Sequence, residues 1–105
     1  MQAVLQAIAE PRRREILLLL QRRELTVGEV ASHFTVTRPA ISQHLGILKA
    51  AGLVSDRREG TRRLYRVRPE GLMELREFLE TFWEDGLARL KQAAESEERR
   101  IAERD

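Results

Sequence analysis

The chain has 105 residues, the length of one ordinary domain, and its 19 Lys and Arg against 17 Asp and Glu give a formal charge of +2. It contains no cysteine, which excludes disulfide scaffolds, thiol chemistry and zinc sites with a Cys ligand, and its two histidines leave little for a histidine-rich metal site. The longest apolar run is Ile16 to Leu20, far short of the roughly 20 residues that a membrane helix needs. Met1 leads almost directly into a charged segment, without the apolar region of a secretory signal, so we expect a cytoplasmic chain.

The small net charge hides an uneven distribution along the chain. Residues 1–68 carry 13 Lys and Arg against 6 Asp and Glu, whereas residues 69–105 carry 6 against 11. A basic first part suits a polyanionic partner, and an acidic second part argues against uniform coating of that partner.

The first part of the chain starts with two predicted helices. Apolar residues at helical spacing predict a short amphipathic helix over residues 2–9. Pro11 suits the first turn of a new helix, which we expect to run to about Arg23. Its apolar run over residues 16–20 covers most of the helix circumference, so we expect this helix in the middle of a core.

Residues 26–51 have the pattern of a helix-turn-helix. Thr26 precedes Glu29 by three residues, the spacing of a capping box at a helix start. After a short break, Thr37 can cap a further helix over residues 38–51, and Gly52 is placed to end it in the left-handed conformation. Two helices separated by three or four residues, the second ended by glycine, are typical of this motif.

A hairpin is predicted next. Residues 53–58 and 63–68 are rich in Val, Leu, Tyr and Arg, and the four residues between them include Gly60. Because an isolated hairpin is barely stable in water, residues 53–68 should pack on the helices beside them.

A long helix is predicted to follow from Glu70, since apolar residues recur every three or four positions over some 25 residues. The compact first part is too small to cover this whole stripe. We assign residues 69–98 to the helix and expect residues 95–105, which are low in complexity, to fray.

The element order predicts a fold that is mainly α-helical with a small β-hairpin, a single winged helix-turn-helix domain over residues 1–105 with 53–68 as its wing. In this module the second helix of the pair enters the major groove of DNA. A step of 100° per residue places Ile41, Leu45 and Leu48 on the buried side and turns Pro39, Gln43 and Gly46 outward. The candidate DNA-contacting residues at this helix are Thr37, Arg38, Pro39, Ala40, Ser42, Gln43 and His44.

These side chains suit different contacts with a DNA duplex. Gln43 can form paired hydrogen bonds with an adenine edge, Ser42 can reach a base or a phosphate, and Arg38 can read guanine or hold a phosphate. Pro39 and Ala40 can contact a thymine methyl group. Each has a structural alternative: an exposed glutamine can simply be solvated, Thr37 can act as a cap, and His44 can make a structural hydrogen bond.

The wing is rich in arginine. Six arginines lie within twelve residues, opposed in the sequence by Asp56 and Glu59. Charges on an exposed strand can serve to block edge pairing, but six exceed that need, and guanidinium groups match phosphate oxygens. The candidate DNA contacts of the wing are Arg57, Arg58, Arg62 and Arg63.

Two further features concern the kind of partner. Arg12, Arg13 and Arg14 oppose the dipole of the second helix, and either a phosphate at that turn or a solvated face would explain them. The basic part offers only Tyr65 as a platform for base stacking, which favours double-stranded DNA over a single strand.

The segments EPRRREILLLL, ELTVGEVASHF, TRPAISQHLGILKAAGLV and RREGTRRLYRV closely resemble the ArsR family of bacterial winged-helix repressors. The resemblance covers residues 8–68, and AISQHLGILKAAGLV is its most specific part. It implies a bacterial-type, nucleoid-associated repressor that binds a palindromic operator as a homodimer, often at its own gene. It further implies that the first and last helices, residues 2–9 and 69–98, form the dimer, and the candidate residues are Leu5, Ile8, Leu75, Leu79, Phe82, Trp83 and Leu90.

The sequence departs from the metal-sensing branch of that family. Those members carry cysteines in the third helix, where this chain has Thr26 and Gly28, and the last helix here contains no histidine. We therefore expect no metal and no cofactor, and a repressor that is constitutive, autoregulatory or released by a small molecule or a protein.

Two other functions are alternatives. A winged helix can serve as a protein-interaction module without a DNA target of its own, with the basic surface meeting an acidic partner. An enzyme has little support, because the chain lacks a Cys nucleophile, a glycine-rich phosphate loop and a cluster of His with carboxylates.

Overall fold

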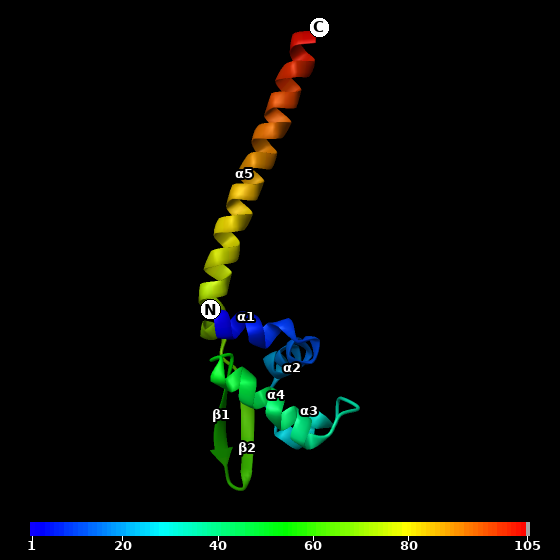
Figure 1. Cartoon of the computed structure of the whole chain (residues 1–105), viewed down its shortest axis with the longest axis vertical. Coiled ribbons are helices and arrows are strands. Elements are labelled where there is room, and N and C mark those ends of the chain that lie inside the picture. The colour runs from blue at the N-terminus through cyan, green and yellow to red at the C-terminus, as the bar shows by residue number, and fades with distance from the viewer. Residues whose placement is uncertain (105) are drawn as a thin grey trace. The chain divides into compact units, whose positions relative to one another are not determined.

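The computed structural model describes residues 1–104 and forms a winged helix-turn-helix, as predicted (Figure 1). The chain divides into two compact units, Met1–Met73 and the part that begins at Glu74. The elements in order are α1 (Gln2–Ala9), α2 (Pro11–Arg22), α3 (Val27–Ala31), α4 (Arg38–Ala50), β1 (Val54–Glu59), β2 (Arg62–Val67), the 3-10 turn η1 (Pro69–Leu72) and α5 (Met73–Arg104).

The core lies in the first unit, where the buried hydrophobic residues fall between Val4 and Leu64. Helix α2 contributes Ile16 and Leu20 to this core, while Leu18 is 65% exposed. The expectation that α2 lies in the middle of the core is therefore wrong. In a domain this small, α1, α4 and β2 cover one side of α2 and leave the other side open.

The predicted start of α3 and the predicted end of α4 are confirmed. The hydroxyl of Thr26 accepts a hydrogen bond from the backbone N–H of Glu29, whose carboxylate accepts one from the N–H of Thr26, which forms a complete capping box. Gly52 has a φ of 77°, the left-handed conformation that ends α4. Helix α3 is short and ends at Ala31.

The wing is an antiparallel hairpin in which Val54 pairs with Val67 and Glu59 pairs with Arg62. Its turn is two residues long, tighter than the expected four, with Gly60 at a φ of 63°. The sequence did not predict that Leu25 would pair with Tyr65, with N···O distances of 3.1 and 2.8 Å. This bridge attaches the segment before α3 to the edge of β2 that does not pair with β1, and the wing and the helix-turn-helix belong to one unit.

Helix α5 begins at Met73, after the η1 turn, rather than at Glu70. It continues to Arg104, so the expectation of a frayed segment from Glu95 is wrong. Good helix formers and an ion pair between Glu97 and Arg100 at i, i+3 spacing support this last part. None of the residues described in α5 is buried. Within the described residues no helix is long and apolar enough to cross a membrane.

Candidate nucleic-acid interface

The outward face of α4 is free of polar partners. Ile41, Leu45 and Leu48 are buried on the inner side, as predicted, and Ser42 and Gln43 are exposed on the outer side. The side chains of Ser42 and Gln43 make no hydrogen bond within residues 1–104. Pro39 and Gly46 are exposed with them, so this face can approach a flat or grooved partner closely.

The residues at the start of α4 have structural roles. The hydroxyl of Thr37 accepts a hydrogen bond of 3.3 Å from the N–H of Ala40, which is a helix cap. The guanidinium group of Arg38 lies over Gly28 of α3, so close that a Cβ at Gly28 would sit 2.4 Å from Nη2. The missing side chain at Gly28 therefore makes room for Arg38.

His44 is half-buried, and its Nδ1 lies 3.4 Å from Nη1 of Arg13. This contact is the structural alternative that the sequence left open for His44. A phosphate contact at this residue remains a prediction.

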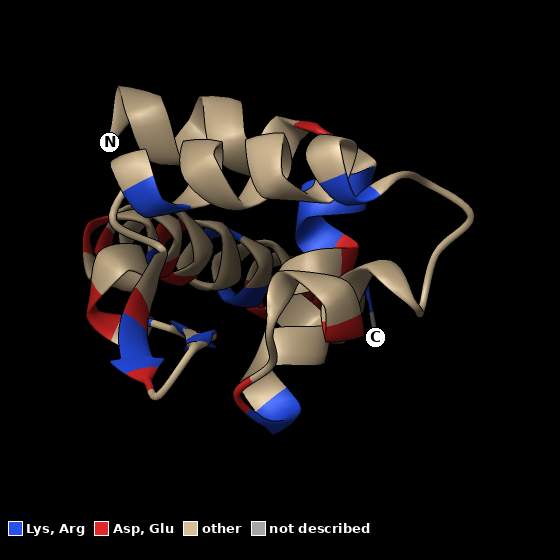
Figure 2. Ribbon diagram, turned by 90° about the horizontal axis from the view of Figure 1, so that it is seen from below, with Lys and Arg blue, Asp and Glu red and all other residues tan. Residues whose placement is uncertain are grey.

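Three of the four candidate arginines of the wing are held by acidic side chains. Arg57 pairs with Glu24 at 2.7 Å and with Glu59 at 3.0 Å, and Arg62 pairs with Glu29 at 3.0 Å. Basic and acidic segments accordingly alternate along the hairpin in Figure 2. The sequence had identified Glu59 but not Glu24 or Glu29, because both lie 33 positions from their partners.

Asp56 is the centre of a second cluster. Its side chain is 6% exposed and accepts from Lys49, whose Nζ lies 2.9 Å from Oδ1, and from Arg63. Hydrogen bonds from Lys49 and Arg63 hold the pKa of Asp56 below its ordinary value. The cluster joins the last turn of α4 to both strands of the wing. Lys49 had not been assigned a role from the sequence.

Hydrogen bonding also lowers the pKa of the other two acids. For Glu29 the largest cause is the backbone N–H of Thr26, with a smaller effect of Arg62, and for Glu24 the largest cause is Arg57. The pKa of Arg57 is raised in turn by Glu24. These pairs are therefore ionised at neutral pH.

Arg58 differs from its neighbours in the wing. Its side chain is exposed and makes no ion pair or hydrogen bond within the described residues. Among the four candidate arginines of the wing, it is thus the one that can bind an anion without first releasing a carboxylate.

The arginines at the start of α2 bind the end of α1. Arg13 donates from Nε to the carbonyl of Ala7 at 2.6 Å, and Arg14 donates from Nη1 to the carbonyl of Ile8 at 2.6 Å. These carbonyls have no partner inside α1 and lie at the negative end of its dipole. Neither a phosphate nor a solvated face is needed to explain the two residues. Arg12 lies over the ring of Phe34, 4.7 Å from its centroid.

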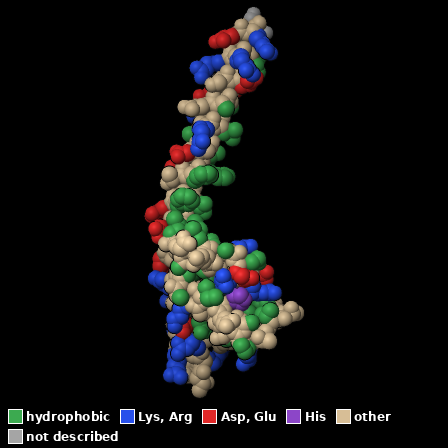
Figure 3. Space-filling view, in the orientation of Figure 1, with side chains coloured by type: hydrophobic (Ala, Val, Ile, Leu, Met, Phe, Trp, Pro, Cys, Tyr) green, Lys and Arg blue, Asp and Glu red, His purple; other side chains and the backbone are tan. Residues whose placement is uncertain are grey.

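The candidate dimer residues are exposed or half-buried. In α1, Leu5 is exposed and Ile8 is half-buried. In α5, Leu75 is half-buried and the other candidates are exposed, with Phe82 at 68% and Trp83 at 69%. Figure 3 shows hydrophobic side chains gathered along α5. Their role in a dimer remains a prediction.

Comparison with known proteins gives a consistent result. The model of the bacterial regulatory protein arsR family matches residues 10–56. The chain is 48% identical over 92 residues to the HTH-type transcriptional regulator Rv2034 of Mycobacterium tuberculosis, covering 88% of this chain and 86% of the relative. The chain belongs to the ArsR family. The predicted family and the winged fold are thus confirmed, and since the family consists of transcriptional regulators, so is the prediction that the chain is not an enzyme.

Other relatives agree with this ArsR-family assignment. The transcriptional repressor SdpR of Bacillus subtilis is 48% identical over 60 residues, which are 57% of this chain and 67% of the relative. An ArsR-like regulator from Rhodococcus sp. RHA1 has a TM-score of 0.75 at 35% identity, with 90% of both chains covered. The homodimeric winged helix-turn-helix DNA-binding domain of Mb0332 from Mycobacterium bovis has a TM-score of 0.64 at 35% identity, covering 82% of this chain and 80% of that one.

Proposed function

We propose that this ArsR-family regulator is a metal-independent repressor that binds an inverted-repeat operator in double-stranded DNA as a homodimer and can act on its own gene. The observation that carries the proposal is the unpartnered outer face of α4, with Ser42 and Gln43 exposed, on the same rigid unit as the cationic wing. In a winged helix-turn-helix this face meets base edges and the wing meets the backbone.

The contacts divide into two kinds. Gln43 forms paired hydrogen bonds with adenine, Ser42 reaches a neighbouring base or phosphate, and Pro39 supplies apolar contact. Arg58 binds phosphate directly, and the remaining wing arginines, Arg57, Arg62 and Arg63, exchange their carboxylate partners for phosphates. This exchange makes binding sensitive to salt.

Dimerisation is supported by the apolar stripe of α5. Large side chains such as Leu79, Phe82, Trp83 and Leu90 are more than half exposed, which a stable monomer rarely tolerates along one stripe. A second copy would bury them, together with Leu5, Ile8 and Leu75. Two-fold symmetry then places two recognition helices about 34 to 36 Å apart, which predicts a palindromic site.

Metal independence is supported by the positions where metal-sensing relatives carry thiolates. Here the hydroxyl of Thr26 is used in the capping box, and the cationic group of Arg38 lies over Gly28. A bound metal cation would be repelled by that guanidinium group. No group of three or more His, Asp and Glu able to hold a metal was found among residues 1–104.

Selection of bound DNA from a random pool, followed by anisotropy titrations, tests the proposal. Gln43→Ala should reduce discrimination against mismatched sites by about 1–3 kcal/mol, whereas Arg58→Ala should weaken all duplexes alike and reduce the salt slope by about 1. Gln21→Ala and Arg22→Ala, which alter exposed residues of α2, are the matched controls. Added Zn²⁺ should leave the affinity unchanged.

The outcomes separate the alternatives. Binding without dependence on salt or sequence would contradict the proposal. A purified dimer that binds no DNA would favour the protein-interaction module instead.

A further inference from the structure

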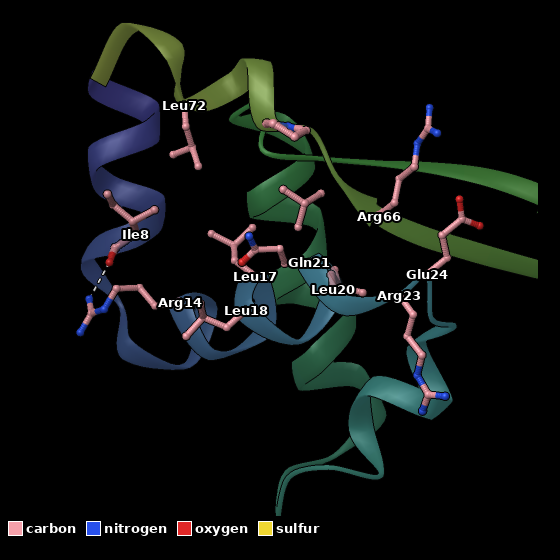
Figure 4. A pocket seen from close by; sticks show the side chains of 12 residues that line it. Ile8, Arg14, Leu17, Leu18, Leu20, Gln21, Arg23, Glu24, Arg66 and Leu72 are labelled. Atoms are coloured by element: carbon pink, nitrogen blue, oxygen red, sulfur yellow. Dashed lines mark hydrogen bonds between the residues drawn. The ribbon is translucent and has the colours of Figure 1, made fainter. Parts of the chain in front are cut away.

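The first unit contains an apolar pocket that the proposed DNA contacts do not use. It has a volume of about 620 Å³ and lies between α1, α2, the end of β2 and the η1 turn (Figure 4). This volume is in the range of roughly 300–1,000 Å³ that is usual for small-molecule sites. Ile8, Leu17, Leu18 and Leu72 are among its apolar lining.

The side of α2 that the core leaves uncovered forms part of the pocket wall. Leu17 and Leu18 belong to the apolar run of this helix, and Leu18 is 65% exposed although the helix has a core face beside it. Of the candidate residues for DNA binding and dimerisation, Ile8 alone lines the pocket. An apolar hollow that persists on a small domain marks a binding site more often than a packing defect.

One end of the pocket is cationic. Arg23, Glu24 and Arg66 line it there, and Figure 4 shows the guanidinium groups of Arg23 and Arg66 pointing away from the pocket in opposite directions, with Glu24 between them. Ile8, Leu72 and Arg14 lie at the other end, where the guanidinium group of Arg14 donates to the carbonyl of Ile8. Glu24 is neutralised by Arg57, whose Nε and Nη2 lie 2.9 and 2.7 Å from its Oε2.

The two cations at the mouth are available. The side chain of Arg23 has no polar partner within the described residues. Arg66 donates from Nε to the hydroxyl of Ser55 at 3.2 Å, and its charge helps to lower the pKa of Glu24, while its two terminal nitrogens make no hydrogen bond within those residues. The end of the pocket therefore favours an anion, and its body favours hydrocarbon.

We propose that this pocket binds an amphiphilic carboxylate with an unbranched hydrocarbon chain. The chain lies against Leu17, Leu18 and Leu72, and Arg23 and Arg66 turn over the mouth to pair with the carboxylate. Decanoate, which has this chemistry, is the probe.

Two residues that line the pocket also connect it to the wing. Glu24 lines the pocket and holds Arg57, and Arg66 is a residue of β2 itself. A carboxylate at the mouth binds Arg66 of β2 and lies beside Glu24, which holds Arg57, so we expect it to reorder the hairpin and to lower operator affinity. This effector role rests on the proposed function, whereas binding of the carboxylate does not.

Calorimetric titration of the full chain with saturated carboxylates below their micelle concentrations tests the site. From octanoate to dodecanoate the dissociation constant should fall roughly three- to fourfold per added methylene, until the chain fills the pocket. Decylamine should bind at least tenfold more weakly than decanoate. A flat dependence on chain length, or equal binding of the amine, would overturn the proposal.

Two pairs of variants locate the site. Leu18→Ser should weaken decanoate binding at least tenfold, and Ile47→Ser, the same kind of change at an exposed residue outside the pocket, should not. Arg23→Gln should weaken decanoate more than decanol, with Arg22→Gln as the matched control. Circular dichroism establishes that each variant is folded, and wild-type affinity in folded Leu18→Ser would overturn the assignment.

The two proposals can fail separately. Calorimetry without DNA reports on the pocket, and anisotropy with operator reports on the regulator. Decanoate binding by a chain that binds no duplex would contradict the proposed function and support the pocket. Operator binding without decanoate binding, the result expected if a second copy covers the pocket, would overturn the further inference.

Discussion

Arg13 joins three helices through one guanidinium group. It lies in the first turn of α2, donates to the carbonyls of Gln6 and Ala7 at the end of α1, and approaches His44 of α4. Hydrogen bonds from a charged donor to otherwise unpaired carbonyls are among the stronger polar contacts in a protein. A single side chain thus sets the position of α1 against the helix that presents Gln43.

Arg13→Lys keeps the charge but removes the forked geometry, and should lower the free energy of unfolding by about 1–3 kcal/mol. Urea unfolding at a fixed protein concentration measures this. Arg22→Lys, at an exposed residue of the same helix, should change the stability by less than about 0.5 kcal/mol. Equal effects of the two substitutions would show that the contacts with α1 contribute nothing.

Because of Asp56, the free energy of unfolding depends on pH in the acidic range. Because its pKa is lowered in the folded state, its contribution is present above the ordinary carboxyl pKa of about 4 and is lost as the pH falls through the folded pKa. At neutral pH, Asp56→Asn should lower the free energy of unfolding by roughly 1–3 kcal/mol.

The difference between Asp56→Asn and the wild type should shrink as the pH falls below the carboxyl range, since the wild-type side chain is then protonated as well. Urea titrations at pH 7 and at pH 3 measure it. A difference that stays constant between these two pH values would contradict the assigned ion cluster.

At the scale of elements, α5 is the helix whose sequence pattern has no partner within its own unit. Its apolar stripe has helical spacing, and its described side chains remain unburied. Such a stripe is stabilised when another helix covers it, as in helix bundles and coiled coils.

Phe82→Ala should raise the dissociation constant of the proposed dimer more than tenfold, because large aromatic side chains dominate interface energies. Sedimentation equilibrium measures the constant. Lys91→Ala lies on the opposite side of the same helix and should leave it nearly unchanged. A dimer equally strong in both variants would place the interface elsewhere.

The wing shows which features of an element can be predicted from the sequence and which cannot. Two segments rich in Val, Leu, Tyr and Arg, with Gly60 between them, predicted the hairpin, since strand composition and turn chemistry are local. Its acidic partners Glu24 and Glu29 were missed because ion pairs over 33 positions leave no local pattern. The bridge between Leu25 and Tyr65 was missed for the same reason.

At the scale of the whole molecule, basic and acidic residues are concentrated in different parts of the chain, and we propose different roles for these parts. The first 68 residues carry 13 cations against 6 acids and contain the proposed DNA contacts, whereas residues 69–105 carry 11 acids against 6 cations. An acidic α5 disfavours contact of that helix with DNA.

A fragment of residues 1–73 should fold cooperatively, because the buried core lies within it, but it should be monomeric. It should bind a half-site and lose the added affinity of a full inverted repeat, which two linked contacts provide. Light scattering and anisotropy on half and full sites measure both properties. A dimeric fragment would contradict the role of α5.

The sequence by itself determined the elements, the caps at Thr26 and Thr37, and the outward face of α4, because periodicity and capping act between residues a few positions apart. The tertiary structure decided which charges are already paired, why Arg13 and Arg14 stand at the start of α2, and that one side of α2 forms a pocket. These properties arise between segments distant in the chain, where side chains meet through packing and no local spacing records the contact.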